Sequence, residues 1–155
     1  MDLEAEIRDA VDHDVRVGVT DCSPFPETAA AIRQRVDSGL HGGLGFTYGD
    51  PDGSTQPQRH FPWAKSIVVV AVPYLTSGDG VDASTARSVA RFAEGDRYER
   101  VRETLDKVAA VLRLRGHRIE RVFDDDRLVD RAVAVRAGVA WNGKSTMALT
   151  PGHGP

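Results

Sequence analysis

The run Ser66-Ile67-Val68-Val69-Val70-Ala71-Val72 constrains the fold more than any other part of the sequence. Its β-branched residues favour a strand, and Pro73 ends it. Apolar residues follow one another without the alternation of a strand that has one face in water. This pattern is typical of a strand at the centre of a sheet, so we expect it to be covered on both faces.

Helical and strand-like patterns alternate around this run. We expect further strands at residues 15–19, 118–123 and 147–149. We expect helices at residues 2–12, between Pro24 and Gly39, at 86–93, from Asp96 to Gly116, and at 128–137. Asp96, with Glu99 three residues later, forms a capping-box-like start. This order indicates an α/β or α+β domain in which helices cover a mixed sheet.

Composition sets limits on the class of protein. A chain of 155 residues with 41% hydrophobic residues corresponds to one globular domain, residues 1–155. The net charge of −3 gives no general reason to expect nucleic acid or a membrane surface as a partner. The apolar runs are too short to span a membrane and the acidic start is unlike a signal peptide, so we expect a cytoplasmic protein. The single cysteine, Cys22, excludes an internal disulfide and an all-cysteine cluster site.

Two features allow both a functional and a structural interpretation. Residues 39–62 form a long segment rich in Gly and Pro that also carries aromatic residues and Arg59. It is either a functional loop or a solvated connector held by its aromatic side chains. Cys22 lies between a predicted strand and a helix, where it is either a small buried hydrophobic residue or a nucleophile.

Three consecutive carboxylates follow the predicted strand at 118–123. We expect Asp126 to cap the next helix, because a carboxylate accepts hydrogen bonds from free N–H groups at a helix start. Asp124 directly follows the strand and is the candidate to face a pocket, where partial burial would raise its pKa and suit it to general acid catalysis. Structural capping remains the alternative role for Asp124. Asp130 and Arg131 are adjacent in the helix and point to different sides.

Residues 138–145 match the G-x-x-x-x-G-K-[ST] pattern of a nucleotide-binding P-loop. A P-loop needs a buried strand before the first glycine and a helix after the last residue. Here a predicted helix precedes Gly138, and Pro151 follows Ser145 too closely for a helix. We therefore expect no nucleotide binding.

Several motifs resemble one family. The pattern Asp-x-x-x-Leu-x-Asp-Arg-Ala begins at Asp124, and Arg-Ala-Gly-Val-x-Trp-x-Gly-Lys-x-Thr-Met begins at Arg136, with Pro-Gly-His-Gly-Pro at 151–155. Residues 61–67 and 90–98 carry shorter matching runs. Together they resemble the N-terminal domain of the epoxyqueuosine reductases. The chain departs from the family's usual residues at Glu99, Arg127 and Ser145.

The resemblance implies a cobalamin-binding α/β domain, related to corrinoid-dependent reductive dehalogenases, in an enzyme that reduces epoxyqueuosine to queuosine in tRNA. It assigns Asp124 as proton donor and Arg131 as an active-site arginine. The cobalamin-binding residues that it implies are Arg59, Arg91, Phe92, Asp124, Trp141, Gly143, Lys144, Ser145 and Ala148.

The family also carries a module with two 4Fe–4S clusters, through which electrons arrive. The cluster cysteines are missing from these 155 residues. We therefore expect the chain to be the N-terminal domain of a longer enzyme. The alternative is a corrinoid-binding or corrinoid-handling protein without catalytic activity.

Overall fold

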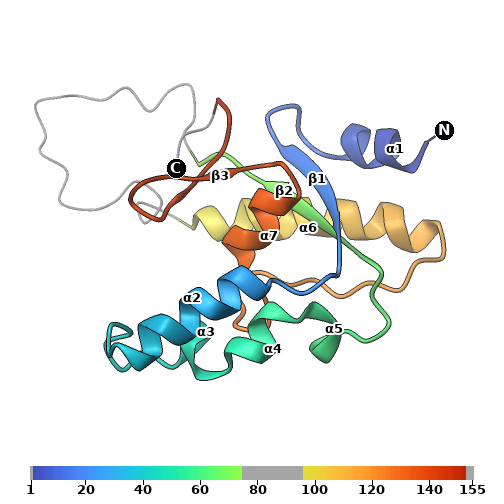
Figure 1. Cartoon of the computed structure of the whole chain (residues 1–155). Coiled ribbons are helices and arrows are strands. Elements are labelled where there is room, and N and C mark those ends of the chain that lie inside the picture. Colours follow the sequence, from blue (N-terminus) through green and yellow to red (C-terminus); the bar gives the residue numbers. More distant parts are fainter. Residues whose placement is uncertain (1, 75–95, 153–155) are drawn as a thin grey trace, which may run out of the picture.

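The computed structural model describes residues 2–74 and 96–152 of the chain. Within these ranges helices and short strands are mixed, as expected for an α/β or α+β domain (Figure 1). The expected helix at 86–93 lies outside the described residues.

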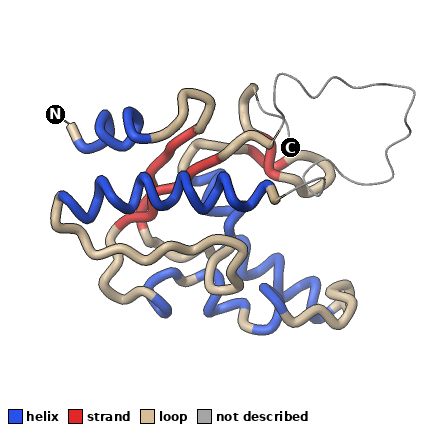
Figure 2. Tube along the Cα trace, turned by 180° about the vertical axis from the view of Figure 1, so that it is seen from behind, coloured by secondary structure: helices blue, strands red, loops and turns tan. Residues whose placement is uncertain are grey.

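Strands β1 (Arg16–Asp21) and β2 (Ser66–Ala71) form an antiparallel pair in which Gly18 lies opposite Val69. Helix α6 (Arg97–Leu114) crosses behind this pair in Figure 1 and in front of it in Figure 2. Helix α7 (Asp130–Arg136) lies on the opposite face and contacts both strands. The pair is thus covered by one helix on each side.

Arg136 fixes α7 against the end of β1. Its Nε donates to Thr20 Oγ1 at 3.1 Å, its Nη1 donates to the carbonyl oxygen of Ser23 at 2.8 Å, and its guanidinium carbon lies 3.6 Å from the centre of the Phe25 ring. An arginine over an aromatic ring gains both electrostatic attraction and packing. One side chain therefore ties α7 to the connection between β1 and α2 (Pro26–Asp37).

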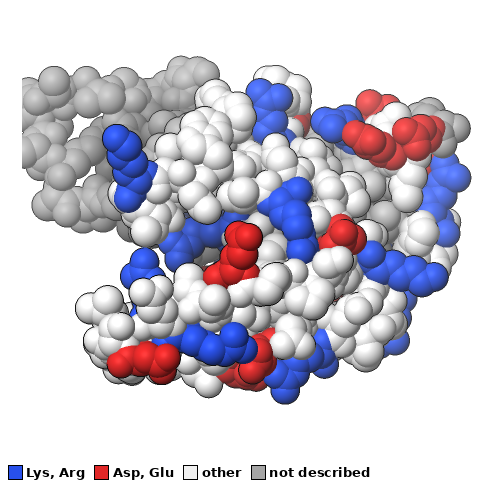
Figure 3. Space-filling view, in the orientation of Figure 1, with Lys and Arg blue, Asp and Glu red and all other residues white. Residues whose placement is uncertain are grey.

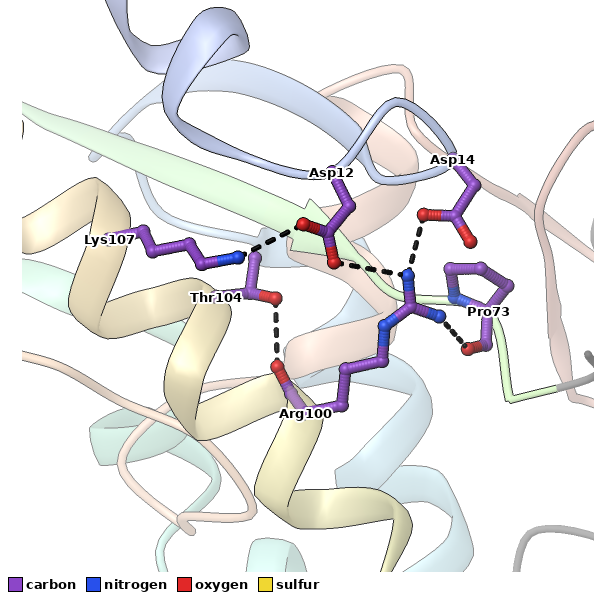
Figure 4. A network of polar contacts seen from close by, with 6 residues as sticks. All are labelled: Asp12, Asp14, Pro73, Arg100, Thr104 and Lys107. Atoms are coloured by element: carbon purple, nitrogen blue, oxygen red, sulfur yellow. Dashed lines mark hydrogen bonds and ion pairs between the residues drawn. The ribbon is translucent and has the colours of Figure 1, made fainter.

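Helix α1 (Leu3–Ala10) packs on α6, as its predicted apolar stripe requires. The turn after α1 is held by a polar network, of which Figure 4 shows six residues. Arg100 Nη2 donates to Asp14 Oδ1 at 2.6 Å, Arg100 Nη1 donates to the carbonyl oxygen of Pro73 at 3.0 Å, and Lys107 Nζ donates to Asp12 Oδ1 at 3.0 Å. The network joins α1, α6 and the end of β2.

A lower group of helices supports this centre (Figure 1). It consists of α2, α3 (Phe46–Gly49), α4 (Pro51–Thr55) and α5 (Pro57–His60). The prediction of one long loop over residues 39–62 was therefore wrong. The prolines that suggested a loop stand at the first positions of α4 and α5, where a missing N–H costs nothing. Ser54 and Thr55 are almost fully buried, so this segment is packed and not a solvated connector.

The strand predicted at 118–123 is not formed. No strand within the described residues pairs with the second edge of β2. Strand β2 is therefore half-buried at the edge of a pair, and it is not the covered central strand that we expected. Side-chain contacts hold the segment instead. Arg121 forms an ion pair with Asp106, and the Arg118 guanidinium lies 4.4 Å from the centre of the Trp63 ring. The described sheets are both antiparallel, so the expected mixed sheet is also not observed.

The main core cluster lies between α2, α7 and β2. It contains Phe25, Ile32, Val129 and Val133, with Ile67 and Val69 packed against it. Cys22 is buried, and this burial raises the pKa of its thiol, so it is a structural hydrophobic residue. On the face seen in Figure 3, acidic and basic side chains are interspersed. No helix in the described ranges combines the length and hydropathy needed to cross a membrane.

Candidate active site

A cavity of about 770 Å³ opens between β2, α6 and the segment 116–124. Apolar side chains make up most of its wall, among them Val68, Val108 and Val122. The carboxylates of Asp124 and Asp130 also belong to the wall. A mostly apolar cavity of this size with a few polar groups is typical of a small-molecule site.

Asp124 has an unusual backbone conformation. Its φ angle is +49°, in the left-handed region that residues other than glycine rarely adopt. Such conformations cost energy and recur at functional sites. Asp124 is also exposed, and it is one of the residues that line the cavity. Asp124 thus lies at a cavity, as expected, but it is exposed and not partly buried as the sequence suggested, and no strand precedes it.

Asp125 forms a local ion pair with Arg127. Its Oδ1 accepts a hydrogen bond from the Arg127 backbone N–H at 3.0 Å, and Arg127 Nη2 lies 2.5 Å from its Oδ2. These contacts hold the pKa of Asp125 below its usual value, chiefly through the side-chain hydrogen bond to Arg127. Asp125 therefore stays charged and closes the turn that leads toward α7.

The expected helix cap at Asp126 is not formed. Helix α7 begins at Asp130, its N-cap residue is Val129, and no side chain caps it. Asp126 is exposed. The turn closed by Asp125 and Arg127 lies where the cap was expected, and the N-cap position is three residues later, at Val129. Asp126 is thus out of reach of the free N–H groups.

Asp130 is a candidate that sequence reasoning missed. Burial of its carboxyl, together with the negative charges of Asp124 and Asp125, raises its pKa from 3.8 to about 6. The residue as a whole is nonetheless exposed to solvent, which screens the neighbouring charges and limits the size of this pKa shift but not its direction. A carboxyl that is partly protonated near neutral pH can hold or pass a proton. No sequence signal could have found it, since the shift depends on the cavity.

Arg131, the next residue, points to the hairpin that follows α7. Its Nη1 donates to the carbonyl oxygen of Thr146 at 2.6 Å. The side chains of Asp130 and Arg131 thus lie in different surroundings, as expected for adjacent helical residues. Arg131 does not line the cavity.

The predicted cofactor residues after α7 lie on the hairpin of β3 (Trp141–Asn142) and β4 (Ala148–Leu149). β4 was expected, whereas β3 was not. The side chains of Trp141 and Met147 are 49% and 47% exposed, so the hairpin presents apolar surface to solvent. Lys144 and Ser145 are exposed in the turn. None of these hairpin residues lines the cavity.

Three further positions complete the predicted set. Arg59 lies in α5, where its Nη1 is 3.8 Å from Asp50 Oδ1, and it does not line the cavity. Arg91 and Phe92 lie outside the described residues. Of the predicted residues within 2–74 and 96–152, only Asp124 lies on the cavity wall.

The P-loop-like pattern does not form a phosphate-binding loop. Gly138 follows α7, where a P-loop has a strand. Lys144 and Ser145 lie in the turn of a hairpin, where a P-loop begins its helix. The structure thus agrees with the expectation from sequence.

Known proteins resemble this chain over most of its length. The epoxyqueuosine reductase of Bacillus cereus is 32% identical over 146 residues, which cover 90% of this chain, and that of Staphylococcus aureus is 30% identical over 144 residues. A family model described as "Epoxyqueuosine reductase QueG, DUF1730" matches residues 55–125. This chain is related to the epoxyqueuosine reductases. These matches confirm the resemblance that the motifs suggested.

A solved structure has the same fold. The crystal structure of an epoxyqueuosine reductase with an epoxyqueuosine-modified tRNA-Tyr stem loop superposes with a TM-score of 0.75 and 28% identity, covering 98% of this chain and 41% of the other. The chain spans 38% of the length of the Bacillus cereus reductase. It thus corresponds to less than half of its epoxyqueuosine reductase relatives.

Proposed function

We propose that this chain forms the N-terminal, cobalamin-binding domain of an enzyme that reduces epoxyqueuosine to queuosine in tRNA. The observation that carries the proposal is the match of 98% of the chain to an epoxyqueuosine reductase in complex with its modified tRNA stem loop. We further propose that the domain shares its corrinoid-binding architecture with the reductive dehalogenases.

The proposed chemistry assigns a proton-donating role to Asp124. Reductive opening of an epoxide requires electrons at one carbon and a proton for the oxygen that leaves that carbon. Asp124 is accessible at the wall of a mostly apolar cavity, and its strained backbone fixes its position. The negative charge of Asp124 in turn contributes to the raised pKa of Asp130, so the two carboxyl groups are electrostatically coupled.

The residues of the hairpin fit a corrinoid. A corrin ring has broad apolar faces and polar amide arms, and the half-exposed Trp141 and Met147 offer apolar surface beside the exposed Lys144 and Ser145. Gly143 has no side chain, and a Cβ atom at this position would lie only 3.0 Å from Leu149 Cδ1, closer than an ordinary van der Waals contact. We propose that Trp141, Gly143, Lys144, Ser145 and Ala148 hold the cofactor. We extend this role to Arg59, Arg91, Phe92 and Asp124.

Cobalamin would supply the electrons at the epoxide carbon when it is bound. These electrons must reach it from elsewhere in the protein. A 4Fe–4S cluster takes four cysteine thiolates, and the sequence has one cysteine. We therefore propose that an iron–sulfur module in a longer protein, more than twice the length of this chain as in the relatives, acts as the electron donor.

The proposed substrate is tRNA that bears epoxyqueuosine. The support is the tRNA stem loop bound by the structural neighbour. A tRNA substrate favours a cytoplasmic location, as the sequence suggested.

A corrinoid-binding or corrinoid-handling protein without catalysis is the second candidate function. The observation that favours it is the single cysteine in the sequence. The reductase needs a proton donor, whereas a corrinoid-handling protein does not. A handling protein gains nothing from the carboxyl of Asp124, whereas the reductase loses its proton donor when that carboxyl is replaced.

Titration of the purified chain with cob(II)alamin tests the binding that both candidates share. We expect a perturbed absorption spectrum and a perturbed electron paramagnetic resonance spectrum of the bound form. Trp141→Ala should weaken binding, while Arg113→Gln, a change on the exposed side of α6 outside the cavity wall and the hairpin, should preserve it. An unaltered cobalamin spectrum in the presence of folded protein would contradict the cofactor assignment.

A further inference from the structure

The turn of the β3–β4 hairpin contains a residue in an unfavourable conformation. The Gly143 N–H donates to the carbonyl oxygen of Met147 at 2.8 Å, and the Thr146 N–H donates to the carbonyl oxygen of Gly143 at 3.1 Å. Between these bonds Thr146 has a φ angle of +66°. Threonine is β-branched and disfavours this left-handed region more than most residues. The turn therefore needs an interaction that holds Thr146 in place.

Arg131 provides that interaction. Its Nη1 donates to the Thr146 carbonyl oxygen at 2.6 Å, and a hydrogen bond from a charged donor is stronger than one between neutral groups. Arg131 is the second residue of α7, directly after Asp130. The neighbouring helical residue Val133 and the N-cap Val129 are both buried in the main core cluster. The guanidinium thus connects a rigid element to the turn.

Arg131 has no carboxylate partner that would compete with this contact within the part of the chain that the structure describes. Within residues 2–74 and 96–152, no ion pair between Arg131 and a carboxylate is observed, and Arg131 is not part of the cavity wall. The neighbouring arginines differ, because Arg127 pairs with Asp125 and Arg136 lies over the Phe25 ring. The contact that the fold gives to Arg131 is with the hairpin.

We propose that Arg131 is a positioning residue for the Gly143–Met147 turn. By holding the carbonyl of Thr146, it keeps the turn in the conformation that presents Trp141, Lys144 and Ser145 together. This inference deepens the proposed function and rests on it for one consequence, namely that cobalamin affinity depends on Arg131. It replaces the expectation that Arg131 acts on the reacting groups.

The test uses the complete 155-residue chain with four variants: Arg131→Gln, Arg131→Lys, Thr146→Gly, and Thr146→Gly combined with Arg131→Gln. Arg113→Gln on the exposed side of α6 is the matched control, since it removes an arginine charge away from the hairpin. Circular dichroism and thermal melting establish that each variant is folded. Hydrogen exchange of the Gly143 and Thr146 amides reports on the turn without any ligand. Cobalamin titration reports on the binding surface.

We expect Arg131→Gln to speed exchange of both amides by about tenfold, the effect of losing one charge-assisted hydrogen bond at an accessible position. Cobalamin affinity should fall by a similar factor. Thr146→Gly in the Arg131→Gln background should restore both readouts in large part, because glycine adopts a positive φ without strain. Arg131→Lys keeps the charge but not the planar donor, so its effect should lie between those of wild type and Arg131→Gln. If Arg131→Gln does not fold, Arg131→Lys carries the same comparison.

Three outcomes separate the alternatives. Unchanged exchange of the Gly143 and Thr146 amides in folded Arg131→Gln would overturn the positioning role. Recovery of slow exchange in the double variant without recovery of cobalamin affinity would support the turn-holding role but overturn its proposed consequence for affinity, since Arg131 would then contact the ligand itself. If exchange responds as expected but wild type and all variants fail to bind cobalamin, the turn-holding role is supported and the proposed function fails.

Discussion

Gly18 in β1 lies against the last turn of α7 so closely that a side chain there would overlap the carbonyl oxygen of Ala137. The same Cβ atom would lie 2.7 Å from Val139 Cγ1. Both obstacles belong to residues that are packed in place, Ala137 at the end of α7 and the buried Val139. The absence of a side chain at residue 18 thus sets the distance between the β1–β2 pair and α7, and through α7 the positions of Asp130 and Arg131.

Gly18→Ala should therefore destabilise the protein. Overpacking of this kind costs about 1–3 kcal/mol in free energy of unfolding. Urea denaturation followed by circular dichroism measures the change. Gly45→Ala is the matched control, because Gly45 has a φ angle of −78° and a Cβ atom there would meet no heavy atom within 4 Å, and it should change the stability by less than about 0.5 kcal/mol. Equal stability of the two variants would show that α7 can move away from β1 without cost.

Asp124→Asn tests the proposed proton donor in the longer reductase. The amide keeps the shape of the side chain but has no proton to transfer, so turnover of epoxyqueuosine in tRNA should fall by about 10²–10⁴-fold. Thermal stability should change little, since Asp124 is exposed and caps no helix. Turnover is compared at saturating cobalamin, because Asp124 is also proposed to contact the cofactor. Reducing equivalents are supplied in excess so that proton transfer limits the rate.

Asp126→Asn is the matched control for that experiment. Asp126 is exposed two residues away, and neither it nor its amide would lie on the cavity wall. Its replacement should leave turnover within about twofold of wild type, as expected for a surface residue outside the site. Normal turnover of Asp124→Asn would show that another group donates the proton, and Asp130 would be the next residue to replace.

Asp130→Asn should make stability depend less on pH. The pKa of Asp130 in the folded protein, about 6, lies above the ordinary value of 3.8, so folding favours the protonated carboxyl and the charged form opposes it. The destabilising effect is absent below about pH 4, grows between about pH 4 and 6, and is complete above. Asp130→Asn should therefore stabilise the protein at pH 7.5 and have little effect at pH 4.

The size of this gain is limited by solvent. Asp130 retains accessible surface, so screening reduces the contribution to about 1 kcal/mol or less. Urea denaturation of wild type and Asp130→Asn at pH 4, 5.5 and 7.5 measures it. A gain of the same size at all three pH values would mean that the carboxylate is not destabilised by its surroundings.

Arg100→Met should destabilise the protein where α6 meets the turn after α1 and the end of β2 (Figure 4). The change removes the hydrogen bonds to Asp14 and to the carbonyl oxygen of Pro73, while Met keeps much of the apolar stem. We expect a loss of about 1 kcal/mol in free energy of unfolding, smaller at 1 M salt, because the contacts are partly exposed. Lys107→Met removes a single contact to Asp12 and should have a smaller effect. Equal losses at low and high salt would show that the packing of Arg100 matters more than its charge.

Local sequence patterns determined the elements whose signals are complete within a few residues. Asp96 accepts a hydrogen bond from the Glu99 N–H at 3.1 Å, as the capping-box-like start indicated, and α6 follows with its apolar stripe turned inward. The β-branched run gave β2 its bounds to within one residue. Gly138 ends α7 with a φ angle of +74°, which glycine adopts freely. The motif block at 124–147 was enough to indicate the related family.

Tertiary structure decided the rest. Residues 118–123 have the pattern of a strand, but a strand forms only where a partner edge is within hydrogen-bonding distance, and here contacts with Trp63 and Asp106 hold the segment in another position. The pKa of Asp130 depends on the cavity wall and on the charges of Asp124 and Asp125, which chain spacing does not specify. Likewise the hydrogen bond from Arg131 to Thr146 crosses fifteen positions of sequence. Hydrophobic periodicity is a property of neighbouring residues, whereas pairing, burial and charge coupling depend on which distant residues the fold brings together.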